Sequence, residues 1–323
     1  MKAEALRQFS RSVLVAAGSD PAEATVVADV LVWCDEVGRP NQGVWRLPVL
    51  CERLQRGLFE SPCHPHMELK TVSLATLDGR AGQGHYVAYQ AMNNAIALAK
   101  AEGIAAIVVR NSNFFGAGGY YASMAAQTGL IGIALSNSFP KVRAFNGEHP
   151  VLGTNPLAFA CPAREGEPLV LDMATSALAG STVRKQRECD SPAKSEAAAL
   201  EPLGGSKGYG LALLVEIMSG VLSGGGFSHQ VKSMYENFHE PGNNGHFFLA
   251  LDIEKLMPLT VFRERMLTLM DWLAASGATG EVKYPGQNRW EILKQTQTAG
   301  VQLDDTTQAA LRELARKYQI ASL

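Results

Sequence analysis

The stretch IAAIVVRNSNFFGAGG, residues 104–119, contains the features that decide the fold class. It opens with six apolar residues, Ile104 to Val109, a length and composition typical of a buried strand. The polar, glycine-rich segment that follows, Asn111–Gly119, is expected to be a loop. Before the strand, an Ala-rich amphipathic pattern at 87–101 predicts a helix. A buried strand next to helices predicts a protein that contains both sheet and helix.

The same alternation continues on both sides of this stretch. Alternating or β-branched apolar runs predict further strands at residues 69–77, 131–137, 157–160, 169–172 and 247–251. Helical spacing of apolar residues predicts helices at 2–36 (two helices), 47–58, 120–127, 208–222, 259–276, 290–298 and 304–318. Asp20 is the expected N-cap of the second helix, with Pro21 in its first turn. The polar segment 181–199 is expected to be an exposed loop.

The order of these elements predicts an α/β (α+β) protein. Helices dominate both ends of the chain, and strands dominate its centre. We therefore expect a discontinuous helical lobe, residues 1–66 and 260–323, packed on a sheet-containing lobe, residues 67–259.

Composition excludes several classes of protein. The chain has 323 residues, 46% of them hydrophobic, and a net charge of -2, which gives no reason to expect binding to nucleic acid or to an anionic membrane. No apolar run approaches the roughly 18 residues of a membrane span. Five cysteines without C-x-x-C spacing fit a reducing cytoplasm. The run Cys63 to His66 has metal-binding donors but no second pair, so we expect no metal site.

Small polar residues and glycines gather at the ends of the predicted strands. The clusters are Asn111–Gly119, Ser136–Ser138, Gly153–Pro156, Asp172–Ser176 and Pro202–Gly208. Each cluster alone can be an ordinary turn. Together they offer backbone N–H groups and hydroxyls suited to a phosphate or a carboxylate, and Lys207 precedes a helix N-terminus that would also attract an anion.

Several motifs, taken in order over nearly the whole chain, resemble the malate/L-lactate dehydrogenase family, a non-Rossmann class. They are Arg110–Asn113 with Phe115-Gly116, Gly153–Pro156, Leu171–Ser176, Leu203–Gly210, Gly245–Phe248 and Pro285-Gly286. The resemblance implies a largely antiparallel sheet, NADPH or NADH as cofactor, a small carboxylate substrate and a homodimer.

The resemblance also implies the site residues. Arg46 would grip the substrate carboxylate with two parallel hydrogen bonds, beside Gln42 and Thr154. Gln42, Arg46, Asp172 and Lys207 form the expected catalytic set. The cofactor would lie along Phe114, Phe115, Gly116, Ser138, Thr154, Asn155, Asp172, Met173, Ala174, Thr175, Lys207, Gly286 and Gln287.

The chain departs from the family pattern at informative positions. Gln42 stands where the resemblance implies the proton-donating histidine, and Phe114 stands where it implies a second one. Gln287 replaces an expected Glu, and the segment 181–202 is shorter than usual. Because neither Gln nor Phe exchanges a proton near neutral pH, histidine-mediated oxidation of an alcohol is not expected here.

Three functional hypotheses follow. The first is a nicotinamide-dependent reductase whose substrate, a cyclic imine carboxylate rather than a 2-oxo acid, does not need the lost histidines. The second is a non-redox lyase, cyclase or isomerase in which Asp172 or Lys207 is the leading titratable group. The third is a binding pseudoenzyme that keeps Arg46 and the Gly153–Pro156 cluster.

Overall fold

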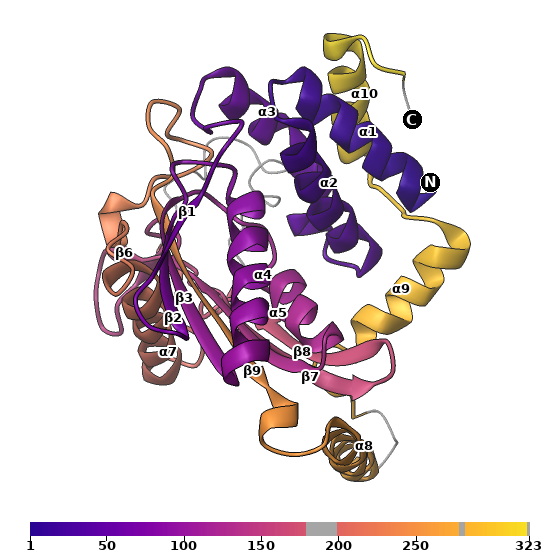
Figure 1. Ribbon diagram of the computed structural model, residues 1–323. Helices are drawn as coiled ribbons and strands as arrows, with labels where there is room; N and C mark the ends of the chain where they lie inside the picture. Colours follow the sequence, from indigo (N-terminus) through magenta and orange to yellow (C-terminus); the bar gives the residue numbers. More distant parts are fainter. Residues whose placement is uncertain (179–198, 278–281, 322–323) are drawn as a thin grey trace.

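The computed structural model describes residues 1–178, 199–277 and 282–321. A seven-stranded sheet in the order β1-β2-β3-β9-β4-β7-β8 forms its centre (Figure 1). Only β2 and β3 pair in parallel, and the other neighbours are antiparallel, which confirms the predicted largely antiparallel fold. The strands are β1 (His66–Leu69), β2 (Leu74–Asp78), β3 (Ile104–Ser112), β4 (Leu130–Ser136), β7 (Leu157–Arg164), β8 (Glu167–Met173) and β9 (Asn244–Asp252).

Alternation along β3 explains why the sheet has two covered faces. Ala105, Ile107 and Val109 are fully buried on the face under α4 (Gly84–Glu102) and α5 (Gly118–Gln127). The Ala-rich surface of α4 lets it approach the sheet closely. On the opposite face, Ala106 and Val108 pack toward α7 (Ser206–Glu216) and the π-helical turn η4 (Ile217–Val221) that continues it. The sheet is thus a middle layer between helices.

A second core joins both ends of the chain. It contains residues of α1 (Ala3–Ala16), α2 (Pro21–Glu36), α3 (Leu47–Gln55) and α10 (Asp305–Tyr318). Figure 1 shows α1 and α10, from the two ends of the described chain, side by side in this helical group. The predicted N-cap is confirmed, since the Asp20 carboxylate accepts from the backbone N–H of Ala22 at 2.8 Å.

The remaining C-terminal helices lie elsewhere. Helix α8 (Leu259–Ala275) contacts β7, and α9 (Gln287–Ala299) contacts both α2 and β8. The division into lobes 1–66 with 260–323 and 67–259 stays a prediction. No helix in the described ranges is long and apolar enough to span a membrane.

Some elements differ from the prediction. The strand expected at 69–77 is two strands, because the Thr71 hydroxyl accepts from the backbone N–H groups of Ser73 and Leu74 and turns the chain between β1 and β2. A small pair, β5 (Val142–Arg143) and β6 (Pro150–Leu152), was not predicted. The loop expected at 181–199 falls almost wholly outside the described residues.

Candidate active site

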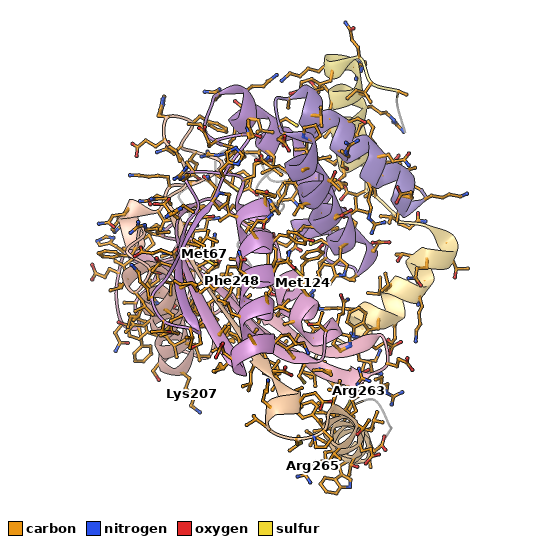
Figure 2. The ribbon with its side chains drawn as sticks, viewed as in Figure 1. Met67, Met124, Lys207, Phe248, Arg263 and Arg265 are labelled. Carbon is orange, nitrogen blue, oxygen red and sulfur yellow. The ribbon has the colours of Figure 1, made fainter. Side chains whose placement is uncertain are left out.

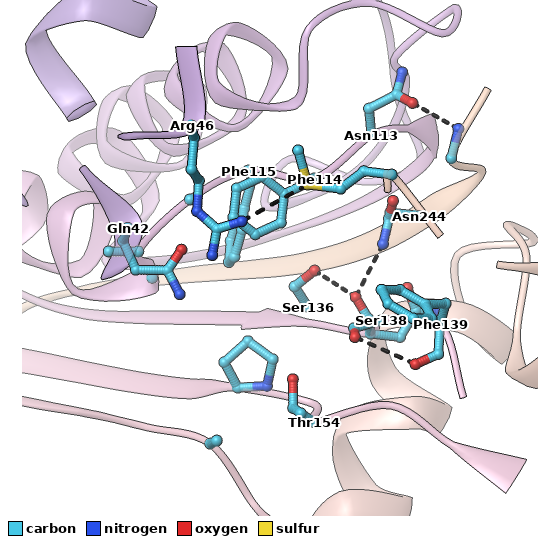
Figure 3. A pocket seen from close by; sticks show the side chains of 18 of the residues that line it. Gln42, Arg46, Asn113, Phe114, Phe115, Ser136, Ser138, Phe139, Thr154 and Asn244 are labelled. Atoms are coloured by element: carbon cyan, nitrogen blue, oxygen red, sulfur yellow. Dashed lines mark hydrogen bonds between the residues drawn. The ribbon is translucent and has the colours of Figure 1, made fainter. Parts of the chain in front are cut away.

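A cavity of about 200 Å³ opens where loops of the sheet meet the helical group (Figure 3). Its walls include the segment 39–46, the loops after β3 and β4, the loop between β6 and β7, the end of β8, and the segment before β9. It brings together residues from five separate parts of the predicted site. Those that line the cavity are Gln42, Arg46, Phe114, Phe115, Gly116, Ser138, Thr154, Asp172, Met173 and Ala174.

Local sequence fixes the turn that presents Arg46. Two 3-10 turns follow one another, η1 (Pro40–Gln42) and η2 (Val44–Arg46). The Asp35 carboxylate accepts from the backbone N–H of Val44 at 2.8 Å and holds the second turn in place. Gly43 is required between the turns, since a Cβ at that position would collide with the same carboxylate.

Arg46 is 4% exposed, and its guanidinium points into the cavity (Figure 3). Its Nε donates to the carbonyl oxygen of Asn41 at 3.0 Å, and its Nη1 donates to the Tyr235 hydroxyl. The guanidinium carbon lies 4.4 Å from the centroid of the Phe114 ring and 5.1 Å from that of Trp45. Aromatic rings and a backbone carbonyl therefore orient this cation, and its planar fork suits a carboxylate.

Gln42 supplies a polar group that a ligand can use. Its Oε1 is buried and has no hydrogen-bond partner among the described residues. Buried acceptors without a partner are uncommon in folded proteins, because each costs free energy. In Figure 3 the Gln42 amide lies beside the Arg46 guanidinium, so an N–H donor of a ligand bound there would satisfy it.

Two asparagines line the cavity, but their side-chain amides form hydrogen bonds with backbone groups. Asn113 donates to the carbonyls of Ala81 and Gly82, and its Oδ1 accepts from the N–H of Gly242 at 2.6 Å. Asn137 likewise donates to the Gly226 carbonyl at 2.7 Å. These side chains join loops that are distant in sequence, so part of the polar pattern in the clusters is structural.

Asn155 lies one layer behind the cavity wall and is fully buried. Its Oδ1 accepts from the N–H of Ser138 at 3.2 Å, and its Nδ2 donates to Glu216 Oε2 at 2.6 Å. Burial raises the pKa of Glu216 from its ordinary value. Thr175 is buried at the same depth and donates to the carbonyl of Thr154.

Asp172 forms an ion pair that the sequence did not indicate. The Nη2 of Arg289, on α9, lies 3.1 Å from Asp172 Oδ2, and both side chains are largely buried. The Nη1 of Arg289 is buried without a hydrogen-bond partner among the described residues. Burial, and then the charge of Arg289, lowers the pKa of Arg39 at the cavity rim. No local motif links positions 117 residues apart.

Positive charge dominates the cavity lining. Among the described residues of the lining, one carboxylate, that of Asp172, is accompanied by five basic side chains, those of Arg39, Arg46, Arg53, Lys141 and Lys232. Such a lining favours an anionic ligand. The basic lining suits the phosphates of a nicotinamide dinucleotide and the carboxylate of a small acid, and the unpartnered Gln42 oxygen suits a hydrogen-bond donor of a ligand.

Three predicted residues lie away from this cavity. Lys207 is exposed in the first turn of α7 and extends from the lower edge of the molecule in Figure 2. Gly286 is the left-handed N-cap of α9, and Gln287 borders a second cavity of about 260 Å³ beneath that helix.

The two buried histidines near the site are structural in character. His246 is fully buried, with Nδ1 2.9 Å from Ser136 Oγ and Nε2 2.8 Å from Ser112 Oγ, as expected for a satisfied core histidine. His85 is buried edge-to-face against Phe114. Burial lowers the pKa of each to about 3, so both are neutral at ordinary pH. Neither lines the cavity.

Comparison with known proteins agrees with this architecture. The family model described as malate/L-lactate dehydrogenase matches residues 1–193 and 187–312. The chain is 34% identical to malate dehydrogenase of Pyrococcus horikoshii, over 98% of this chain and 95% of that relative. A solved malate dehydrogenase structure from Pyrococcus horikoshii OT3 superposes with a TM-score of 0.93 at 33% identity, covering 100% of this chain and 96% of that one. Δ1-Piperideine-2-carboxylate reductase from Pseudomonas syringae superposes with a TM-score of 0.88 at 26% identity, covering 98% and 99%. Matches of this extent place the chain in the malate/L-lactate dehydrogenase family.

Proposed function

We propose that the protein is an NAD(P)H-dependent reductase of a small carboxylate, and that this substrate is a cyclic imine acid rather than a 2-oxo acid. The observation that carries the proposal is a buried guanidinium, Arg46, in a cavity that no histidine lines among the described residues. Reduction of a ketone produces an alkoxide that needs an acid, whereas an imine nitrogen is basic enough to carry its proton beforehand. The resemblance of the fold to a cyclic imine reductase supports the same choice.

The residues of this chain would bind and orient the substrate. Arg46 would bind the carboxylate through two parallel hydrogen bonds, and Gln42 Oε1 would accept from the N–H of the protonated imine. Ser138, Thr154 and Met173, which also line the cavity, would hold the nicotinamide, which supplies a hydride when bound. Phe114 and Phe115 would exclude water from the reacting atoms.

Two measurements test this function. Initial rates with NADH or NADPH should be higher for five- and six-membered cyclic imine carboxylates than for pyruvate-like 2-oxo acids. Titration of the protein with each dinucleotide, followed by fluorescence, should show saturable binding. Absence of binding at millimolar concentration would favour the non-redox or pseudoenzyme alternatives instead.

We also propose a homodimer and a cytoplasmic location. An exposed apolar surface on α7 and η4 supports association with a second copy, because patches of this kind mark contact sites. Its residues are Leu211, Leu213, Leu214, Ile217, Val221 and Leu222, each 38–57% exposed. Free, buried Cys34, Cys51, Cys63 and Cys161 are consistent with a reducing compartment. Light scattering after gel filtration tests the dimer.

A further inference from the structure

Arg53 is a charged residue of the cavity lining to which the proposed mechanism gives no role. It lies on α3 and is fully buried. Burial lowers its pKa to about 10, so the guanidinium is still charged at neutral pH. In the described part of the chain no carboxylate pairs with it. A charge buried in this way costs free energy unless hydrogen bonds satisfy it.

Backbone carbonyls of a single segment, residues 231–243, supply those hydrogen bonds. Arg53 Nη1 donates to the carbonyl oxygen of Asn237 at 2.7 Å and to that of Met234 at 3.4 Å. Arg53 Nη2 donates to the carbonyl oxygen of Glu240 at 3.0 Å. The segment is described throughout and forms neither helix nor strand. Its conformation therefore depends on contacts of this kind rather than on a regular backbone ladder.

The same segment also packs against Arg46. Arg46 Nη1 lies 3.8 Å from the Met234 sulfur and donates to the Tyr235 hydroxyl, and these are two of several contacts of this guanidinium. Arg46 is the N-cap of α3, and Arg53 follows about two helical turns later on the same side of the helix. Met234 thus connects the two guanidiniums, with its carbonyl on Arg53 and its sulfur on Arg46.

We propose that Arg53 is a positioning residue for the substrate carboxylate. It fixes the segment 231–243, and that segment fixes Met234 and Tyr235 against Arg46, so that the planar fork of Arg46 stays directed at the carboxylate. Arg53 itself does not bind the substrate. This inference rests on the proposed function, in which Arg46 binds the carboxylate and Gln42 accepts from the protonated imine.

Two pairs of variants test the contact from both of its sides. Arg53→Met keeps the length of the side chain and removes every donor, whereas Arg53→Lys keeps the charge and some of the hydrogen bonding. Asn237 Oδ1 accepts from the backbone N–H groups of His239 and Glu240, each at 3.0 Å, and so shapes the turn that faces Arg53. Asn237→Ala removes that acceptor, and Asn237→Asp retains one.

Leu14→Ala is the control for a general loss of stability. Leu14 is fully buried on α1, in the same helical core, and its truncation leaves the donors of Arg53 intact.

The binding probe is pyrrole-2-carboxylate, a planar ring with an N–H next to its carboxylate. It offers a carboxylate to Arg46 and a donor to Gln42 Oε1. Its Kd is measured by calorimetry with saturating NADP⁺ or NAD⁺. KM and kcat are measured in parallel for a cyclic imine carboxylate with NADPH or NADH.

The expected effect is on substrate binding and is reversed by the conservative variants. Arg53→Met should raise the Kd of the probe and KM about 10-fold and lower kcat less than about 3-fold. Asn237→Ala should raise Kd and KM about 5-fold, and Arg53→Lys and Asn237→Asp should both stay within about 2-fold of the parent. The Kd of the dinucleotide should change less than about 2-fold in all four variants.

Three results would overturn the proposal. The first is an unchanged Kd and KM in folded Arg53→Met. The second is an equal rise in Leu14→Ala, because loss of stability would then explain the effect. The third is a rise in Arg53→Met without one in Asn237→Ala, because Arg53 would then bind the ligand itself. If Arg53→Met does not fold, a rise in Asn237→Ala that Asn237→Asp reverses supports the proposal, and no rise overturns it.

Failure of the underlying function gives a different result. If the parent binds pyrrole-2-carboxylate and reduces no cyclic imine acid, the reductase function is wrong, and the Kd values still decide the role of Arg53. If the parent binds no pyrrole-2-carboxylate and reduces no cyclic imine acid, the carboxylate site itself is wrong, and the role of Arg53 is rejected with it.

Discussion

Arg46 is the residue on which proposed substrate binding depends most. Its guanidinium is oriented by Phe114, Trp45 and the Asn41 carbonyl, so geometry as well as charge is fixed. Arg46→Lys keeps the charge and loses the bidentate fork, and we expect KM for the imine acid to rise at least about 10-fold. Arg56→Lys, on the exposed end of α3, is a matched control. An unchanged KM for Arg46→Lys would remove this residue from the site.

Substitutions of Gln42 and Phe114 test whether the proposed substrate preference depends on a described cavity lining without histidine. The variant Gln42→His with Phe114→His introduces imidazoles, whose protonated forms can donate a proton near neutral pH. We expect the ratio of 2-oxo acid to imine turnover to rise at least about 10-fold, measured by initial rates. Loss of the Phe114 ring can cost about 1–3 kcal/mol, so unfolding is measured first.

The matched control combines Gln42→His with Phe139→His, which changes a different aromatic residue of the lining. An unchanged ratio in a folded Gln42→His, Phe114→His protein would contradict the explanation by lost histidines.

The sequence motifs predicted only some of the residues that form the candidate site. Arg46 and Asp172 both line the cavity and were predicted from the family motifs. Arg289 and Tyr235 were missed, because their partners lie 117 and 189 residues away in sequence and only the fold brings them together. Asn155 was predicted at the cofactor, but its amide holds loops behind the wall.

At the scale of elements, the loop between β6 and β7 is held by one buried side chain. Asn155 has a positive φ of 35° and connects Ser138, Ala212 and Glu216. Asn155→Ala leaves the buried Glu216 carboxylate without one of its donors, and we expect a loss of about 2–4 kcal/mol in the free energy of unfolding. Denaturant titration measures it.

Asn146→Ala is the control for this change, since Asn146 also has a positive φ, of 62°, and is exposed. Backbone strain alone costs about 1 kcal/mol there. Equal losses in the two variants would mean that the hydrogen bonds of Asn155 contribute nothing.

Periodicity explains which elements could be predicted. The long amphipathic pattern of α4 and the continuous apolar run of β3 were predicted correctly, because burial of one helix face imposes a period and a strand covered on both faces is apolar throughout. The turn between β1 and β2 was missed because its signal is one hydroxyl, that of Thr71. Strands of two or three residues, such as β5 and β6, are too short to show a period.

At the scale of the whole molecule, two buried neutral histidines make stability depend on pH. His85 and His246 have pKa values lowered to about 3, whereas in the unfolded chain each is near 6.5. As the pH falls below about 6.5, only the unfolded chain takes up these protons, so stability decreases down to about pH 3. Each histidine contributes a slope of about 1.4 kcal/mol per pH unit.

His85→Phe should reduce that slope by about 1.4 kcal/mol per pH unit between about pH 5.5 and pH 4. The measurement is urea unfolding at several pH values, with the exposed His229→Gln as control. A slope that stays the same in His85→Phe would mean that His85 is protonated in the folded protein.

Transfer of a hydride from the dinucleotide to a cyclic imine acid is the most direct test of the proposed reductase activity. The protein is incubated with a five- or six-membered cyclic imine carboxylate and with NADPH or NADH that carries two deuterium atoms at C4 of the nicotinamide ring. The mass of the product is then determined by mass spectrometry. We expect a cyclic amino acid with one deuterium on the carbon next to the carboxylate, and much less of it with Arg46→Lys. If no labelled amino acid forms with either dinucleotide and either ring size, the protein is not a reductase of cyclic imine acids.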